Sequence, residues 1–362
     1  MKNICFINCD FSIGGGAERV LNNIALNIKD QNCVHIVSLW NKFGKPFTEL
    51  PEDIYYYVCR QGQGRKRHLF PKSIYSLLKY IKRNRIDIIV LVGCYPASLV
   101  QVFKYFTKCK LVFWDHGALI NEWDKKVARD ARKKAVINCD KTITLTKRNR
   151  DDYQKKFHIK DEKLTYIYNA IDEKIFDFTK DRYDIGSKKI ITAGRFSREK
   201  GFDMMVDVAR MVFDKHPDWT WDVYGDGEEF SVIKEKIKDQ NLENNLILKG
   251  AVDHIYELYH QYAMYVLPSY REGLPLVLLE AKANRLPIVA FDVITGPREI
   301  VEDKQDGFLI PCYDKGLMSQ RICELIEDET LRVQFSENSQ SNIDLFRIDK
   351  IITKWISLIK SL

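Results

Sequence analysis

Short apolar runs alternate with amphipathic stretches along the whole chain. The runs are rich in Ile, Val, Leu and Phe and suit buried strands, whereas the stretches between them repeat their apolar residues at helical spacing. Strands that alternate with helices build parallel sheets with helices on both faces, so the pattern predicts an α/β protein. The expected strands are residues 4–8, 34–39, 86–92, 110–114, 142–145, 164–168, 189–193, 219–224, 246–249, 264–267, 287–291 and 307–310.

A polar stretch without a clear period, residues 172–187, separates the strands of the two halves. The length of 362 residues also favours two domains, at roughly 150 residues per domain. We therefore expect two Rossmann-like domains, residues 1–175 and 176–345, that face each other across a central cleft, and a helix over residues 346–362 that packs on the first domain. Ligands of such sheets bind at the carboxyl ends of the strands.

Positive charge is concentrated in the first half of the chain. Residues 1–180 hold 33 Lys and Arg against 19 Asp and Glu, whereas residues 181–362 hold 24 against 31. Between Asp53 and Asp87 there is no acidic residue, and aromatic residues are interleaved with the bases. Basic side chains beside aromatic ones suit an anionic membrane surface. The bases are Arg60, Arg65, Lys66, Arg67, Lys72, Lys79, Lys82, Arg83 and Arg85.

Residues 71–83 are expected to form a helix, because Ile74, Leu77, Leu78 and Ile81 recur at helical spacing. This apolar stripe could lie in a lipid interface or could face the core of the first domain, and the sequence leaves both interpretations open. A second basic cluster argues against the view that the positive charge of the first half is only a solvated surface without a binding role. It consists of Lys125, Lys126, Arg129, Arg132, Lys133 and Lys134.

The sequence predicts no membrane-spanning helix and no secretory leader. The longest stretch without a charge, residues 88–103, has 16 residues and contains a Gly and a Pro, which makes it too short and too interrupted for a bilayer. We therefore expect a cytoplasmic protein that lies peripherally on the inner face of the cell membrane. Nucleic acid is the other polyanion to consider, but no helix-turn-helix, zinc-finger or RNP pattern supports it.

A glycine cluster follows the first expected strand directly and precedes a helical pattern. Gly14, Gly15 and Gly16 would present bare amides at a helix N-terminus, which is an arrangement that binds anions. The cluster is not a GxGxxG fingerprint, and the second strand ends without an acidic residue to hold a ribose. The sequence therefore argues against an NAD-dependent oxidoreductase.

The second half carries charged residues directly after expected strands. Arg195 and Lys200 follow the strand that ends at residue 193, where two cations could neutralise a diphosphate. Glu272 and Gly273 precede a buried helical pattern that contains Glu280. The two glutamates lie at most about 12 Å apart along a helical path, which is comparable to the length of a sugar, a diphosphate and a ribose. A capping carboxylate and a buried, salt-bridged glutamate are the alternative interpretation.

These motifs together resemble the retaining glycosyltransferases of family 4, which have the two-domain GT-B fold. The motifs are GGGAERV at residues 14–20, GRFSREKG at 194–201, YGDG at 224–227, EGLPLVLLEA at 272–281 and GPREIVEDKQDGFLIP at 296–311. The resemblance covers nearly the whole chain and is strongest over residues 189–311. It implies transfer of a sugar from a nucleotide diphosphate sugar, such as a UDP-hexose or UDP-N-acetylhexosamine. The implied acceptor is a polyprenyl-diphosphate-linked glycan of capsule or lipopolysaccharide synthesis.

The resemblance also implies roles for individual residues. Glu272 would hold the hydroxyls of the sugar ring, Arg195 and Lys200 would bind the diphosphate, and His116 would lie near the donor sugar. Neither a metal ion nor a cofactor is implied. The donor-binding residues besides Glu272, Arg195 and Lys200 are Gly15 and Gly16 on the phosphates, Val252 at the base, Gly273, Leu274 and Leu276 through their amides, and Glu280 on the ribose.

Three questions stay open at the level of the sequence. Retention could use a covalent carboxylate intermediate or attack from the face that the leaving diphosphate occupies, and the second is favoured because no second acid is visibly paired with Glu272. A nucleotide-sugar epimerase with the same two-domain architecture is the first alternative function. A non-catalytic module that binds membranes or partners is the second.

Overall fold

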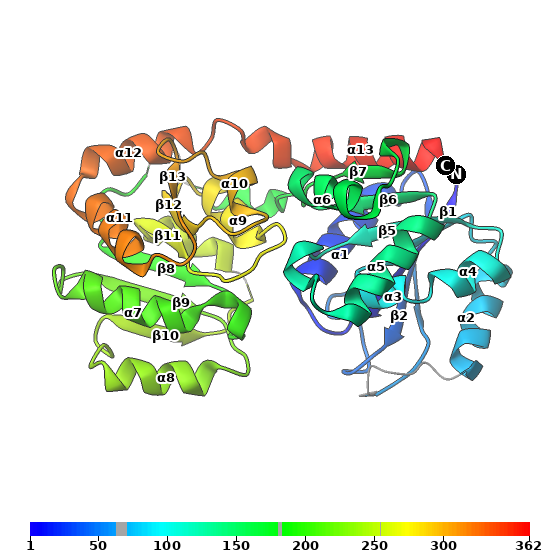
Figure 1. Ribbon diagram of the computed structural model, residues 1–362, viewed down its shortest axis with the longest axis horizontal. Coiled ribbons are helices and arrows are strands. Elements are labelled where there is room, and N and C mark those ends of the chain that lie inside the picture. Colours follow the sequence, from blue (N-terminus) through cyan, green and yellow to red (C-terminus); the bar gives the residue numbers. More distant parts are fainter. Residues whose placement is uncertain (63–70, 180–182, 254) are drawn as a thin grey trace. The chain divides into compact units, whose positions relative to one another are not determined.

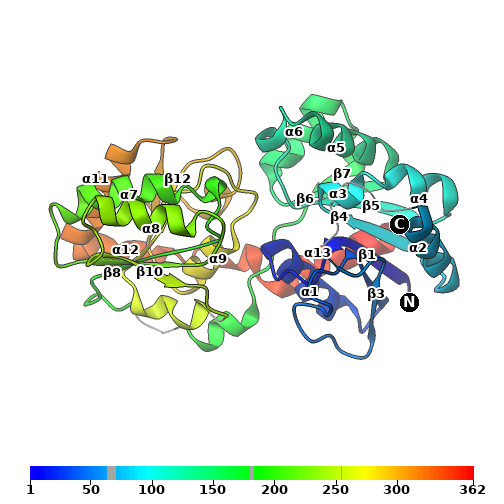
Figure 2. The same ribbon diagram turned by 90° about the horizontal axis from the view of Figure 1, so that it is seen from below.

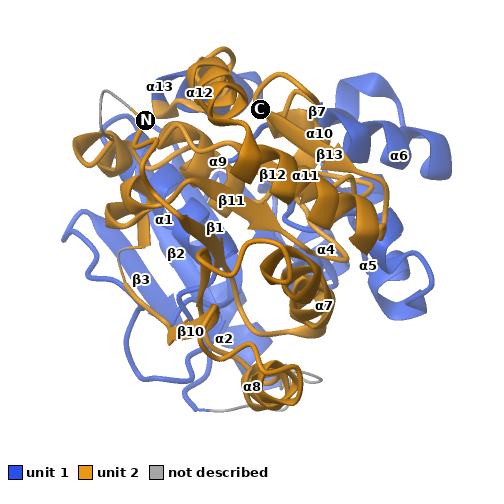
Figure 3. Ribbon diagram, turned by 90° about the vertical axis from the view of Figure 1, so that its left-hand side faces the viewer, with its two compact units in different colours: residues 1–170, 349–362 blue, residues 171–348 orange. Residues whose placement is uncertain are grey.

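The computed structural model describes residues 1–62, 71–179, 183–253 and 255–362. The predicted bases Arg65, Lys66 and Arg67 lie outside these residues. The chain divides into two compact units, residues 1–170 with 349–362 and residues 171–348 (Figure 3). Unit 1 thus ends five residues before the boundary placed from the sequence, and the C-terminal residues belong to unit 1.

Unit 1 is a seven-stranded parallel sheet of order β3-β2-β1-β4-β5-β6-β7 (Figure 1). Its strands are β1 (Asn3–Asp10), β2 (Cys33–Trp40), β3 (Ile54–Val58), β4 (Ile88–Val92), β5 (Lys110–Asp115), β6 (Lys141–Thr144) and β7 (Leu164–Tyr166). Its helices are α1 (Gly16–Ile28), α2 (Pro71–Arg83), α3 (Cys94–Ala97), α4 (Val100–Phe106), α5 (Lys126–Asn138), α6 (Lys147–Phe157) and α13 (Ile348–Ser361).

Helices cover both faces of this sheet because apolar side chains point alternately to either side of each strand. Cys5 and Ile7 of β1 join the core that α2, α4 and α5 complete. Phe6 points the other way and contacts Trp355 of α13, with ring centroids 6.0 Å apart. The C-terminal helix is therefore part of the core of unit 1.

Strand β3 is the one strand of the described chain that the sequence pattern missed. Its residues Tyr55, Tyr56 and Tyr57 look like membrane-facing aromatics beside the basic segment, yet tyrosine also favours strands. The ring of Tyr55 stacks on His35 of β2 at 4.8 Å, and that of Tyr57 stacks on Tyr80 of α2 at 4.3 Å. Two of these tyrosines thus attach the edge strand to its neighbours.

The predicted helix over residues 71–83 is confirmed as α2, but its apolar stripe does not face lipid. Leu77 and Ile81 are buried in the core of unit 1, and Ile74 and Leu78 pack against that core. Of the two interpretations of this stripe, the one in which it faces the core of the first domain is therefore confirmed, and the interfacial one is wrong. Among the described residues, no helix has both the length and the apolar character needed to cross a bilayer.

Unit 2 is a six-stranded parallel sheet of order β10-β9-β8-β11-β12-β13. Its strands are β8 (Lys189–Ala193), β9 (Thr220–Tyr224), β10 (Leu246–Gly250), β11 (Met264–Leu267), β12 (Ile288–Phe291) and β13 (Gly307–Ile310). Its helices are α7 (Phe202–Phe213), α8 (Phe230–Asp239), α9 (Leu276–Ala283), α10 (Pro297–Ile300), α11 (Lys315–Glu327) and α12 (Glu329–Asn338).

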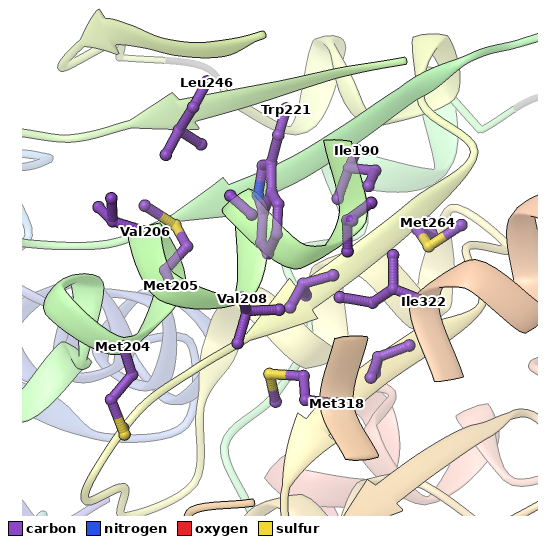
Figure 4. Close-up of a cluster of buried hydrophobic side chains, with 14 of the residues drawn as sticks. Ile190, Met204, Met205, Val206, Val208, Trp221, Leu246, Met264, Met318 and Ile322 are labelled. Carbon is purple, nitrogen blue, oxygen red and sulfur yellow. The ribbon is translucent and has the colours of Figure 1, made fainter. Parts of the chain in front are cut away.

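One face of the unit 2 sheet packs against α7, α8 and α11. Ile190 of β8 and Trp221 of β9 meet Met205 and Val208 of α7 and Ile322 of α11 in this core (Figure 4). The indole Nε1 of Trp221 donates to Thr192 Oγ1 at 2.9 Å, so its buried polar atom is satisfied. This core fixes β8 and β9 rigidly below the loops that follow them.

Candidate active site

The charged residues that the sequence predicts for the site of unit 2 lie at one edge of its sheet. The chain runs outward from β8 through β9 to β10 and then returns to β11 on the other side of β8, so β8 and β11 form the topological switch point. Ligands of doubly wound sheets bind beyond the carboxyl ends of the strands at such a point. Arg195 and Lys200 follow β8, and Glu272 follows β11.

Lys200 and Glu272 are in direct contact. Lys200 Nζ donates to Glu272 Oε1 at 2.8 Å and to Oε2 at 3.1 Å, and the side chains are 26% and 6% exposed. The hydroxyl of Ser269 donates to the same Oε1 at 2.6 Å. A buried carboxylate needs such partners, because an unpaired charge is costly in a low-dielectric environment. The ammonium remains accessible to a further anion.

The backbone holds the loops of β8 and β11 together. The amides of Tyr270 and Arg271 donate to Glu199 O at 2.8 and 3.3 Å. Gly201, with φ of +66°, lies so close to the β11 loop that a Cβ would be 2.1 Å from Pro268 O. Only glycine tolerates both the left-handed conformation and this approach. The contact between Lys200 and Glu272 is therefore set by the main chain on both sides.

A turn after β12 supports Glu272 from its other side. Thr295 is buried, and its hydroxyl donates to Glu272 O at 2.6 Å. Gly296, with φ of +100°, follows at once, and a Cβ there would lie 2.7 Å from both Gly273 O and Pro275 Cδ. The segment from Glu272 to Pro275 is thus enclosed between two loops and has little freedom to move.

Arg195 is exposed on the loop after β8. Its loop is fixed to the β9 turn, since Gly194 N donates to Tyr224 O at 2.9 Å and Phe196 N donates to Asp226 O at 3.0 Å. Within the described ranges, the guanidinium of Arg195 forms no ion pair with an acidic side chain. An unpaired guanidinium on a fixed loop can bind a phosphate group with two hydrogen bonds.

Helix α9 begins four residues after Glu272, which contacts Lys200. Pro275 caps it without a donor, and the amides of Leu278 and Leu279 donate to Pro275 O at 3.2 and 3.4 Å. The amide of Leu276 lies in the first turn, where a helix has no internal acceptor for it. Gly273 and Leu274 lead into this turn. The helix N-terminus therefore adds partial positive charge next to Lys200.

Glu280 lies in the second turn of α9 and is buried. Its Oε2 accepts a hydrogen bond from the hydroxyl of Tyr259 at 3.0 Å. Tyr265 of β11 lies near both glutamates and donates to Ala193 O at 2.9 Å. Burial, with the charge of Glu280 and Glu272, raises the pKa of Tyr265 well above its ordinary value, so the tyrosine remains a donor. Glu272 and Glu280 thus both lie near Tyr265.

Val252 lies on the outer side of the same edge. It follows the end of β10 and is half exposed, and strands β9 and β8 lie between β10 and the switch point. A nucleotide base that reached Val252 would therefore extend away from β11 across the strand ends.

The predicted residues of unit 1 also share one edge of a sheet. Gly15 precedes α1 and Gly16 is its first residue, and His116 follows β5, with β4 between β1 and β5. Strands β1 and β4 form the switch point of unit 1. Burial lowers the pKa of His116 to about 4, although the neighbouring Asp115 opposes this shift. The imidazole is therefore neutral near pH 7.

Several residues that support the site were not predicted. Ser269, Tyr259, Tyr265 and Thr295 act through hydroxyl groups, and such groups are common on ordinary surfaces. The spacing of Ser269 and Glu272, three residues apart, was the one local signal. Arg132, which the sequence assigned to a basic surface, is only 2% exposed and forms an ion pair with Asp115 at 3.0 Å.

Two family models match the chain. Residues 14–174 match the model described as Glycosyltransferase Family 4, and residues 174–342 match the model described as Glycosyl transferases group 1. The first match contains Gly15, Gly16 and His116. The second contains the contact between Lys200 and Glu272.

Individual relatives match nearly the whole length of the chain. An uncharacterized glycosyltransferase of Haemophilus influenzae is 28% identical over 356 residues, which cover 98% of this chain and 99% of the relative. The amylovoran biosynthesis glycosyltransferase AmsD of Erwinia amylovora is 27% identical over 356 residues, 95% of each chain. The solved structure of Anabaena Alr3699/HepE in complex with UDP and glucose has a TM-score of 0.86 at 20% identity and covers 100% of both chains. This last likeness concerns the fold.

Proposed function

The chain belongs to the glycosyltransferases of family 4 and has their GT-B fold, and from this premise we propose that it transfers a hexose or N-acetylhexosamine from a UDP-sugar to a glycan acceptor. The transfer retains the anomeric configuration and needs neither a metal ion nor a cofactor. The acceptor is a polyprenyl-diphosphate-linked glycan in the synthesis of a bacterial cell-surface polysaccharide. The contact between Lys200 and Glu272 at the switch point of unit 2 carries this proposal.

The donor is recognised in three parts. Glu272 accepts hydrogen bonds from the hydroxyls of the sugar, and Glu280 accepts them from the ribose. Lys200, Arg195 and the first amides of α9 bind the diphosphate between these two ends, because cations and helix N-termini attract phosphate. Lys200 therefore touches both the sugar-binding carboxylate and the leaving group.

The chemical step depends on charge that develops on the diphosphate. The bond between the anomeric carbon and the diphosphate oxygen breaks, and the acceptor oxygen bonds to the same face of that carbon. The acceptor proton passes to the departing diphosphate, so no protein nucleophile is needed. Lys200, Arg195 and the amides of α9 stabilise the leaving group in the transition state, a role that is commonly the largest single term in catalysis. We assign His116 to the donor sugar and Gly15 and Gly16 to the phosphates.

The names of two similar proteins support the choice of substrates. AmsD is described as a glycosyltransferase of amylovoran biosynthesis, which agrees with a polysaccharide product. HepE was solved with UDP and glucose, which agrees with a UDP-sugar donor. The strong positive charge of residues 1–180 suits an acceptor that carries a diphosphate in an anionic membrane.

Purified protein incubated with UDP- and GDP-sugars tests the reaction. We expect release of UDP only when a lipid-diphosphate glycan is also present, unchanged by EDTA, and a product whose anomeric proton coupling matches that of the donor. Mass spectrometry and proton NMR give both readouts. Conversion of the sugar without an acceptor would instead identify an epimerase, and an inverted anomeric centre would contradict retention.

The exposed side of α2 and α4 is the surface that we propose lies against the membrane. The two helices lie side by side (Figures 1 and 2), and both pack into the core of unit 1. The exposed aromatics Tyr75, Tyr105 and Phe106 are 69%, 79% and 73% accessible. Aromatic rings beside basic groups favour the interface of an anionic bilayer. The exposed bases of this surface are Lys72, Lys79, Lys82, Arg83, Lys104 and Lys108.

Reversal of three of these charges tests the membrane surface. A variant with Lys79, Lys82 and Arg83 changed to Glu is expected to bind vesicles rich in phosphatidylglycerol about a hundredfold more weakly, at about 1 kcal/mol per cation. A flotation assay measures the binding, and transfer to a water-soluble acceptor should be unchanged. The matched control reverses Lys215, Lys234 and Lys238, which are exposed on unit 2. Equal losses in both variants would contradict a specific surface.

A further inference from the structure

The loop of residues 116–119, which follows β5 and carries His116, is held by an unusual set of buried polar groups. We call it the His116 loop. The inference below rests on the proposed function, because that function assigns His116 to the donor sugar.

Asp115 holds the start of the loop. It is fully buried at the end of β5, where Arg132 Nε donates to its Oδ2 at 3.0 Å and the hydroxyl of Tyr153 donates to the same oxygen at 2.7 Å. Its Oδ1 accepts the amide of Gly117 at 3.1 Å. The carboxylate therefore connects the backbone of the loop to α5 and α6.

Arg132 fixes the loop by shape as well as by charge. Its Nη1 lies 2.7 Å from Glu122 Oε2, so the guanidinium is oriented by two acidic residues. A Cβ on Gly117 would lie only 2.6 Å from Arg132 Nη2. The loop backbone thus packs directly against the buried guanidinium group of Arg132, which leaves no space for a side chain at residue 117.

Asn149 holds the far side of the loop. Its Nδ2 donates to Gly117 O at 3.0 Å, and its Oδ1 accepts the amide of Leu119 at 2.9 Å. Asn149 is itself buried in the first turn of α6, where its backbone N–H donates to Thr146 Oγ1 at 3.1 Å. One side chain therefore satisfies two backbone groups of the loop, as a neighbouring strand would.

The result is a fixed histidine with an unused polar atom. The ring of His116 lies 4.3 Å from that of Trp114, and its Nε2 is buried without a hydrogen-bond partner in the part of the chain that the structure describes. A neutral imidazole offers one donor and one acceptor nitrogen. This nitrogen is therefore free to form a hydrogen bond with a ligand group.

Stability alone is a poor reason for this arrangement. The free energy needed to desolvate a charge pair such as Asp115 and Arg132 is about as large as the free energy of their attraction. Apolar residues of similar volume in their place often give an equally stable protein. The groups instead fix one conformation of the His116 loop. We propose that Asp115, Arg132, Tyr153 and Asn149 are positioning residues that hold the His116 loop in the one conformation that His116 needs for its role at the donor sugar.

A double-mutant cycle between Asn149 and His116 tests the proposal. Asn149→Leu keeps most of the side-chain volume and removes both hydrogen bonds to the loop. We expect kcat/KM for the donor to fall about tenfold when His116 is present and by less than twofold in the His116→Ala background. A role in stability alone would lower activity by the same factor in both backgrounds, and that result would overturn the proposal.

A second variant keeps the test valid if Asn149→Leu does not fold. Tyr153→Phe retains the ring and removes one hydrogen bond from Asp115, and we expect a three- to fivefold loss that again disappears in the His116→Ala background. Tyr80→Phe is the matched control, because it removes a 2.8 Å hydrogen bond to His35 elsewhere in unit 1. The control should leave transfer unchanged. If His116→Ala alone does not lower transfer, the assignment of His116 fails; if it does and the cycle is additive, only the positioning role fails.

Discussion

Glu272→Gln is expected to lower kcat for sugar transfer by about a thousandfold. The substitution keeps the size of the side chain and the hydrogen bond from Ser269 but removes the charge that Lys200 faces at 2.8 Å. Loss of one preorganised electrostatic contact at a transition state typically costs a factor of 10²–10³, and Glu272 also orders Lys200. Initial rates of UDP release with a saturating acceptor measure the effect.

The same substitution separates catalysis from folding. Loss of a charged hydrogen bond to a half-buried lysine lowers the free energy of unfolding by about 1–3 kcal/mol, which shifts the melting temperature by a few degrees. Asp207→Asn is the control, because Asp207 pairs with Lys236 at 2.5 Å and Lys315 at 2.8 Å outside the switch point. The control should melt similarly and transfer normally. Extensive unfolding of Glu272→Gln alone would mean that Glu272 is structural.

Lys200→Met is expected to weaken the binding of UDP itself by about a hundredfold. The ammonium is the cation that we place on the diphosphate, and removing one partner of such a charge pair costs about 2–5 kcal/mol. UDP lacks the transferred sugar that we place on Glu272, so Glu272→Gln should change its affinity by less than threefold. Isothermal titration calorimetry of UDP with the two variants distinguishes the diphosphate site from the sugar site. Equal losses in both would contradict this division of roles.

Arg195 and Arg198 provide a matched comparison on the same loop. Both side chains are exposed, but only Arg195 is placed on the diphosphate. Arg195→Ala should weaken UDP binding about tenfold, which corresponds to about 1.4 kcal/mol, and should reduce the dependence of the affinity on salt. Arg198→Ala should change the affinity by less than twofold. Indistinguishable effects would indicate only a general positive field.

The regular elements of the fold were predictable because each β-strand core is a compact apolar run. Every expected strand is present, with bounds within two residues of those predicted. Strand β3 was missed because its three tyrosines also fit a membrane surface, and only the pairing with β2 selects the strand. The helix over residues 71–83 was placed correctly, whereas its buried face depended on the sheet beneath it.

Arg195, Lys200 and Glu272 could be singled out because each follows a strand and adjoins a glycine. Their supports could not, since the hydroxyl of Thr295 reaches Glu272 only after β12 has been placed beside β11. Arg132 shows the same limit. In the sequence it belongs to a run of bases on a helix. Its ion pair with Asp115, 17 residues earlier at the buried end of β5, has no local sequence signal.

A crystal structure of the protein with UDP bound would show where the diphosphate lies on unit 2. We expect diphosphate oxygens within about 3 Å of Lys200 Nζ and the Arg195 guanidinium, beside the first turn of α9, with the ribose hydroxyls on Glu280. UDP bound at another edge of unit 2, or a diphosphate remote from Lys200, would contradict this expectation.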